Sequence, residues 1–76
     1  MMIDPNKKYT CNGNPVKNIR IVLHNSNGDE VTYPVKGSIV HTSKSGRKSY
    51  EYAIWSLDGK SNIVFPNPEN DLKLQI

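Results

Sequence analysis

Turn-forming residues divide this chain into short segments, and their spacing constrains the fold more than any other feature of the sequence. No window of eleven residues has apolar side chains at i, i+3, i+4 and i+7 without an intervening glycine, proline or asparagine, so no helix is predicted. Between the turns, apolar and polar residues alternate as they do in strands. Thirteen isoleucines and valines, against four leucines and one alanine, also favour strands, because β-branched side chains suit a pleated sheet.

The alternation predicts strand segments at residues 8–11, 16–24, 31–35, 38–42, 49–57, 61–65 and 72–76. Asn12-Gly13 and Asp58-Gly59 are typical of tight hairpin turns. Pro34 suggests an edge or a bulge, and Gly37 suggests a bend. We expect one all-β domain over residues 1–76. Its architecture would be a small five- to six-stranded antiparallel, strongly curved sheet or a partly open barrel.

A chain of 76 residues buries a small core, and such cores are often reinforced. Cys11 is the only cysteine, which excludes an internal disulfide and favours a reducing compartment. His24 and His41 lack the close spacing of zinc ligands, so neither a metal nor another cofactor is expected. Self-association is the reinforcement that remains, and a homo-oligomer is therefore expected.

The composition also limits the partners. No apolar run approaches the length of a membrane span, and residues 1–10 contain no signal-peptide core, so a cytoplasmic protein without membrane contact is expected. The net charge of +3 favours anionic partners such as nucleotides, nucleic acids or acidic proteins. A duplex-DNA binder usually has more densely clustered lysine and arginine.

No catalytic constellation is evident, so the chain is interpreted as a binding module and not as an enzyme. Cys11 follows no motif that would activate a thiol, and it is better explained as a small buried residue. Asp58 is better explained by its turn. Phosphate-binding loops, dinucleotide fingerprints and nucleophile elbows are absent from the sequence.

The strongest candidate for a binding site is the polar loop at residues 41–48. Lys44, Arg47 and Lys48 supply positive charge, and backbone amides around Gly46 offer a concave nest for a phosphate. A solvated hairpin turn is the alternative, since turns commonly use the same residue types.

Aromatic residues follow that loop. Tyr50, Tyr52 and Trp55 are candidates for stacking on a nucleobase. Alternatively, the period of two places Tyr50, Tyr52 and Ile54 toward the core, with Trp55 on the opposite face, exposed or in a subunit contact. Arg20 is a further candidate contact for an anionic ligand, with scattered surface charge as the alternative.

The order of these segments resembles a group of short bacteriophage accessory proteins. The resemblance covers most of the chain and consists of residues 9–16 (YTCNGNPV), 33–37 (YPVKG), Trp55 with Asp58-Gly59, and Asp71-Leu72. The chain differs from that pattern at Cys11, where a basic residue is common, and at Ser56, where threonine is common. The shared motifs are turns and core positions, which indicate a fold more than an activity.

The resemblance implies a phage protein in the host cytoplasm that counters antiviral defence. Our leading hypothesis is a non-catalytic protein that binds and sequesters an anionic ligand such as a nucleotide or cyclic nucleotide signal. The alternatives are a protein-binding inhibitor or adaptor of a host defence enzyme, and a weak single-stranded nucleic-acid binder.

Overall fold

Five antiparallel strands in one sheet make up the protein, and the computed structural model describes residues 2–75. In chain order the elements are β1 (Tyr9–Cys11), β2 (Asn14–Ile21), β3 (Val35–Thr42), β4 (Lys48–Trp55), the 3-10 helix η1 (Pro68–Asn70) and β5 (Leu72–Leu74). The strand order is β4-β3-β2-β1-β5, so β4 and β5 are the edges and the sheet is not closed into a barrel. The predicted all-β antiparallel class is confirmed.

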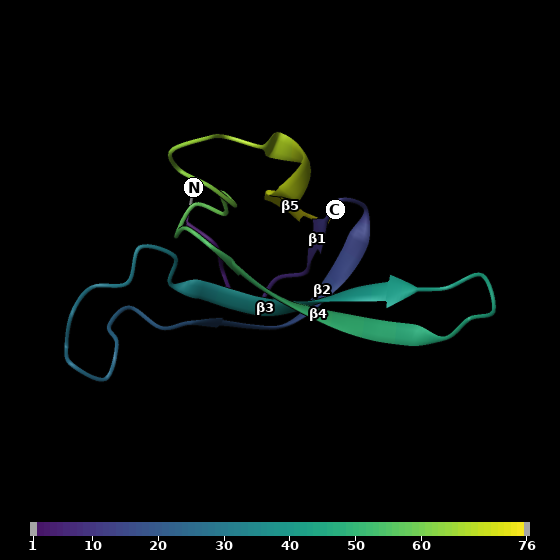
Figure 1. The fold of residues 1–76 in the computed structure, drawn as a ribbon, viewed down its shortest axis with the longest axis horizontal. Coiled ribbons are helices and arrows are strands. Elements are labelled where there is room, and N and C mark those ends of the chain that lie inside the picture. Colours follow the sequence, from purple (N-terminus) through teal and green to yellow (C-terminus); the bar gives the residue numbers. More distant parts are fainter. Residues whose placement is uncertain (1, 76) are drawn as a thin grey trace.

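The β3–β4 hairpin runs along the length of the molecule, and β1, β5 and η1 lie above its middle (Figure 1). The molecule measures 43 × 24 × 24 Å along its principal axes. Between residues 2 and 75 no helix is long and apolar enough to cross a membrane.

Two of the predicted turns form as the sequence indicates. Asn12 and Gly13 have φ angles of 52° and 79°, the positive values that a two-residue turn between β1 and β2 requires. Gly59, with φ of 87°, closes a tight turn in which the Ser56 amide donates to the Lys60 carbonyl at 2.9 Å.

The segments at 31–35 and 61–65 were predicted as strands, and both predictions are wrong for most of their length. The 31–35 segment forms no strand before Val35: beside an isolated bridge between His24 and Glu30, the Val22 amide donates to the Pro34 carbonyl at 2.8 Å and the Val31 amide donates to the Leu23 carbonyl at 3.0 Å. In the second segment the Asn62 side-chain oxygen accepts the Val64 and Phe65 amides, each at 2.9 Å. These amides are satisfied locally, so they are not available to a strand ladder.

Two further boundaries differ from the prediction. Gly37 does not bend the chain, because it lies inside the continuous strand β3, opposite Ala53 of β4. The last strand ends at Leu74, and Ile76 of the predicted segment lies outside the described residues.

A bulge interrupts the pairing of β2 with β3. Lys17 pairs with Ser38 and Arg20 pairs with Lys36, so two residues of β2 stand opposite Gly37 alone. Asn18 has φ of 58°, a left-handed conformation that asparagine tolerates better than most residues. The extra residue puts Lys17 and Arg20 on the same face of the sheet, although strict alternation places them on opposite faces.

The core lies on one face of the sheet. Its buried side chains come from all five strands and from the N-terminal segment: Ile3, Tyr9, Cys11, Val16, Val35, Ile39, Trp55 and Leu72. The N-terminal segment is tied to the end of β4, where the Ile3 amide donates to the Leu57 carbonyl at 2.8 Å.

The faces of β4 are the reverse of the sequence interpretation. Trp55 is 1% exposed, whereas Tyr50 and Tyr52 are 61% and 60% exposed and Ile54 is 40% exposed. Trp55 stands opposite Val35, and its indole nitrogen donates to the Asn70 carbonyl at 2.9 Å. Since both faces of β4 carry apolar residues, the alternation alone does not determine which of them is buried.

Candidate functional site

The face of β2, β3 and β4 that points away from the core is the candidate binding surface, and we call it the open face. The strand registers assign to it ten residues: Lys17, Arg20, Lys36, Ser38, Val40, Thr42, Lys48, Tyr50, Tyr52 and Ile54.

Two tyrosines lie on the open face in the middle of its edge strand, β4. Tyr50 pairs with Val40, and Tyr52 pairs with the small Ser38. Val40 is buried at 3% exposure yet lies outside the core cluster, so the open face has an apolar floor of its own. Both tyrosine rings remain about 60% exposed and are accessible to a ligand.

Positive charge surrounds these rings. Lys17 and Arg20 come from β2, Lys36 from β3 and Lys48 from β4. The only acidic residue in the five strands is Glu51, and it lies on the opposite face because it pairs with the core residue Ile39. The open face therefore combines exposed aromatic rings with cations and has no carboxylate within its strands.

Arg20 reaches across β3 to the aromatic residues. Its guanidinium carbon lies 5.9 Å from the centroid of the Tyr52 ring, within cation–π range. One of its nitrogens, Nη1, donates to the Asn18 carbonyl in the bulge at 3.1 Å. The bulge thus positions the guanidinium beside the ring, with further N–H groups available to an anion.

The turn at residues 43–47 supplies charge but no preformed phosphate cradle. The Gly46 amide donates to the Ser43 carbonyl at 2.9 Å, and the Arg47 amide donates to the Ser43 hydroxyl oxygen at 3.1 Å. These internal bonds occupy two of the amides that the predicted nest around Gly46 would need. Lys44 and Arg47 remain exposed at the tip of the hairpin.

The structure brings four of the predicted site residues together on the open face: Arg20, Lys48, Tyr50 and Tyr52. Trp55 is a correction, because its ring is buried on the other side of the sheet and its N–H already has a partner. Lys17 and Lys36 were missed. The bulge that turns Lys17 to this face depends on Asn18, and nothing in the alternation indicated it.

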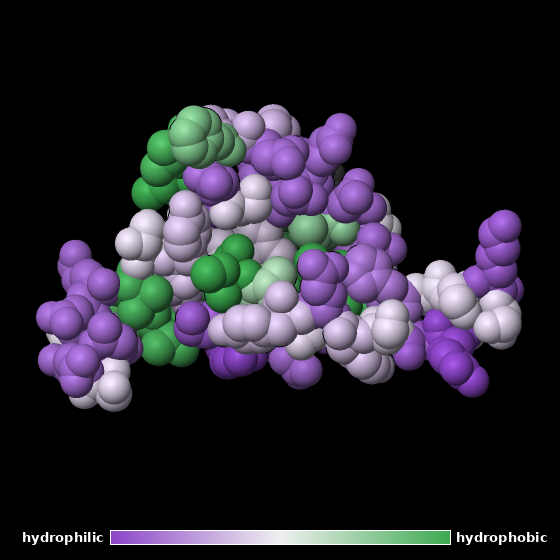
Figure 2. Space-filling view, in the orientation of Figure 1, coloured by the Kyte–Doolittle hydropathy of each residue, from purple (hydrophilic) through white to green (hydrophobic). Residues whose placement is uncertain are grey.

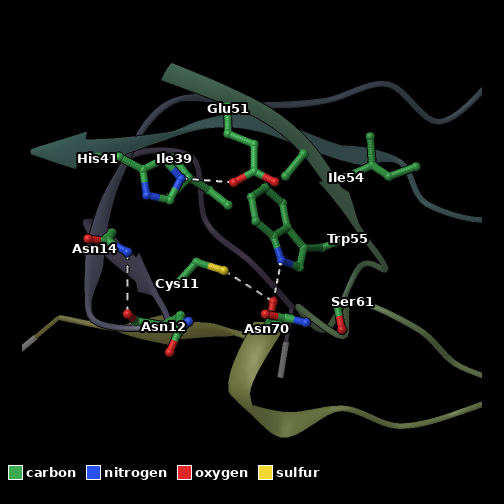
Figure 3. A pocket seen from close by; sticks show the side chains of 11 residues that line it. Cys11, Asn12, Asn14, Ile39, His41, Glu51, Ile54, Trp55, Ser61 and Asn70 are labelled. Atoms are coloured by element: carbon green, nitrogen blue, oxygen red, sulfur yellow. Dashed lines mark hydrogen bonds and ion pairs between the residues drawn. The ribbon is translucent and has the colours of Figure 1, made fainter. Parts of the chain in front are cut away.

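A hollow of about 190 Å³ opens on the core side of the sheet (Figure 3). At its rim the His41 Nε2 atom lies 2.8 Å from the Glu51 carboxylate, and both side chains are partly exposed. Deeper in the hollow, the Cys11 thiol donates to the Asn70 carbonyl at 3.3 Å. The same carbonyl accepts the indole N–H of Trp55.

These contacts favour a structural Cys11 over a nucleophilic one. Burial, followed by the negative charges of Glu51 and Asp71, raises the pKa of the thiol above its usual value. A neutral thiol that donates to a carbonyl is a poor nucleophile. Among the described residues, no three His, Cys, Asp or Glu side chains are grouped to hold a metal ion.

A separate apolar cluster protrudes from the segment between β4 and η1. Its members are Ile63, Val64 and Phe65, which are 50%, 69% and 76% exposed. Figure 2 shows this segment as a hydrophobic projection at the upper left of the molecule. The cluster contains no charge and belongs to neither the open face nor the hollow.

Comparisons with protein-family models, curated proteins and solved structures give no match to the chain.

Proposed function

We propose that the open face binds single-stranded nucleic acid without catalysis. Bases stack on Tyr50 and Tyr52, and the flanking phosphates contact Lys17, Arg20, Lys36 and Lys48. The observation that carries the proposal is the pair of about 60% exposed tyrosines on a face whose only charged strand residues are cations. Exposed rings on a positively charged surface are the recurring means of holding unpaired strands.

Stacking on Tyr50 and Tyr52 supplies the part of the affinity that does not depend on salt concentration. Two residues along a strand are separated by roughly 6.5 Å, so Tyr50 and Tyr52 can each meet a different base. Stacking on one aromatic side chain contributes about 1–3 kcal/mol per base. Because every base has a π face, such a surface tolerates many sequences.

The cations supply the affinity that depends on salt. They come from three adjacent strands spaced roughly 4.8 Å apart, so the phosphates of one nucleic-acid strand crossing the sheet would meet them in turn. Lys44 and Arg47 extend the positive charge toward the tip of the hairpin. Each phosphate contact releases counterions and makes binding weaker as salt rises.

An extended strand fits this surface better than a free nucleotide does. Small-molecule sites are usually enclosed clefts, whereas the open face is an uncovered strand surface. The hollow on the other side of the sheet has the Glu51 carboxylate at its rim, which disfavours phosphate. In the setting that the resemblance implies, binding would sequester single-stranded nucleic acid from a host defence system.

Fluorescence anisotropy with a labelled oligothymidylate tests the proposal. The probe is titrated with the intact chain, with competitor duplex and with mononucleotides, over a range of salt concentrations. We expect the single strand to bind best. If four phosphates are contacted, log K should fall with log salt at a slope of about −3. An absence of binding at low salt, or stronger binding of the duplex or of a mononucleotide, contradicts the proposal.

A matched pair of charge variants locates the site. The triple variant Lys17→Gln, Arg20→Gln, Lys36→Gln removes three cations from the open face. Its salt slope should fall to about −0.7 if one contact remains. Lys60→Gln removes one exposed cation from the turn after β4, and it should change the affinity less than any single open-face substitution. If Lys60→Gln and Arg20→Gln lowered the affinity equally, the effect of a cation would not depend on where it lies on the surface.

A further inference from the structure

Strand β4 is a long and unprotected edge. It spans eight residues and pairs with β3 over its whole length without a register shift. It contains no proline and no bulge, two of the features by which native edges avoid pairing with other chains, and its charged residues are limited to Lys48 and Glu51. The opposite edge, β5, is three residues long.

The hydrogen bonds of the hairpin show which β4 residues face outward. The Ser43 amide donates to the Arg47 carbonyl at 2.8 Å, so this pair is of the hydrogen-bonded type. Hydrogen-bonded and non-bonded pairs alternate along an antiparallel ladder. The backbone groups of Lys48, Tyr50, Tyr52 and Ile54 therefore point away from β3.

These outward groups have no partner elsewhere in the part of the chain that the structure describes, residues 2–75. None of the hydrogen bonds of turns, loops and side chains involves the backbone of these four residues. Beside these groups, the side chains of Tyr50, Tyr52 and Ile54 expose apolar surface. The edge thus presents backbone donors and acceptors next to a side-chain surface that association would cover.

We propose that a second copy of the chain pairs with this edge, β4 against β4 in antiparallel orientation, with Tyr52 opposite the second copy's Tyr52. The dyad is perpendicular to the sheet, and the product is a continuous ten-stranded sheet. In a twofold interface the same surface of each copy meets itself, so β4 of each copy is enough to form the contact.

The position of Glu51 selects this register among its neighbours. A dyad centred on Glu51 would place the two Glu51 carboxylates directly opposite each other, which like charges disfavour. A dyad centred on Tyr52 instead places Glu51 opposite Ala53 and Tyr50 opposite Ile54. A dyad centred on Tyr50 or on Ala53 would pair fewer residues, because it runs past Lys48 at one end of β4 or past Trp55 at the other.

The paired arrangement has a consequence for the open face. A dyad perpendicular to the sheet keeps both open faces on the same side. The tyrosines of the two copies would then form one aromatic strip flanked by cations from both. The inference goes beyond the proposed function and does not depend on it, because the edge is defined by backbone geometry alone.

Cysteine cross-linking without nucleic acid tests both the dimer and its register. In a Cys11→Ser chain that keeps Glu51, the single substitutions Tyr52→Cys and Tyr50→Cys are oxidised separately and as an equimolar mixture. Hydrogen-bonded antiparallel partners lie about 5.5 Å apart at Cα, within the disulfide range of about 4.4–6.8 Å. We expect a covalent dimer from Tyr52→Cys, and little from Tyr50→Cys alone or between the two variant chains. Cross-linking between the Tyr50→Cys and Tyr52→Cys chains, which a dyad centred on Glu51 would produce, or preferential cross-linking of Tyr50→Cys overturns the register.

Sedimentation equilibrium of the unmodified chain tests the association itself. We expect a monomer–dimer equilibrium that Tyr52→Pro weakens at least tenfold, because proline removes an outward N–H that β3 does not use. Circular dichroism checks that the variant still folds, and Tyr52→Phe, which keeps the N–H, should still dimerise. A chain that stays monomeric up to about millimolar concentration, near the weak limit of specific association, overturns the proposal.

Discussion

At the scale of single residues, the burial of a β4 side chain depends on the β3 residue that it stands opposite. Trp55 stands opposite Val35, and Gly37 leaves room for its ring, since a β-carbon there would lie 3.4 Å from Trp55 Cζ3. Tyr52 stands opposite Ser38, on the face that nothing covers. The result is a buried indole that serves the core and exposed phenols that are free to bind.

We expect Tyr52→Ala to weaken oligothymidylate binding by roughly 5- to 150-fold, the effect of losing about 1–3 kcal/mol of stacking. Tyr52→Phe keeps the ring and should retain most of the affinity. Since Tyr52 is 60% exposed, neither substitution should lower the free energy of unfolding by more than about 0.5 kcal/mol. Anisotropy and urea denaturation measure the two effects, and equal affinities for the alanine and phenylalanine variants would rule out stacking.

Because of Cys11, the free energy of unfolding should depend on pH in the alkaline range. Because its pKa is raised in the folded protein, the thiol contributes stability below the unfolded pKa of about 8.5, and this contribution is lost as pH rises through the folded pKa. The stability of the parent chain relative to Cys11→Ser should therefore fall by up to about 1.4 kcal/mol per pH unit in that window.

Urea denaturation of the two chains at neutral pH and above pH 9 measures this difference. A difference that does not change with pH would show that the thiol ionises equally in both states. Alkylation of the native parent chain should be slow, because the thiol is 3% exposed.

At the scale of elements, the β2 bulge determines the charge of the open face. Without Asn18 in its left-handed conformation, Lys17 and Arg20 would lie on opposite faces. We expect Asn18→Gly to be close to neutral. Asn18→Val should cost about 1–2 kcal/mol of unfolding free energy, since a β-branched residue resists positive φ. Thermal denaturation compares the variants, and equal stability of the glycine and valine chains would exclude a strained position.

Gly37 is the second element-scale constraint, because residues of the neighbouring strands β2 and β4 pack directly over it. A β-carbon there would lie 3.0 Å from Val16 Cγ1 and 3.4 Å from the Lys17 carbonyl oxygen. We expect Gly37→Ala to destabilise the fold by about 1–3 kcal/mol through overpacking. Ser38→Ala, one residue along the same strand but on the open face, should cost less than about 0.5 kcal/mol. The reverse order of effects in denaturant titrations would contradict this packing.

The sequence was sufficient for the elements that local chemistry determines. Asn12-Gly13 and the 43–47 turn are encoded by their own residues, and the strands beside them formed close to the predicted segments, except that β2 ends at Ile21 instead of His24 and β3 begins at Val35. The prediction of a strand at 61–65 was wrong because an asparagine side chain accepts hydrogen bonds from amides of this segment. The predictions for the faces of β4 and for the position of Lys17 were wrong because both features depend on pairing between strands. No single segment of the sequence contains that information.

At the scale of the whole molecule, the sheet separates two kinds of surface. The core, the Cys11 thiol and the Glu51–His41 pair lie on one side. Tyr50, Tyr52 and the four cations of the open face lie on the other. With a net charge of +3, the chain attracts polyanions to the molecule as a whole, and the absence of carboxylates from the strands of the open face directs them there.

Mapping of amide chemical shifts during titration with oligothymidylate tests the central claim most directly. The account predicts that the largest shifts fall on the open-face residues of β2, β3 and β4, with Tyr50 and Tyr52 foremost. Residues around the hollow, such as Asn70, and those of the 61–66 segment should change little. Shifts concentrated at the hollow or on the apolar segment, with the tyrosines unaffected, would contradict it.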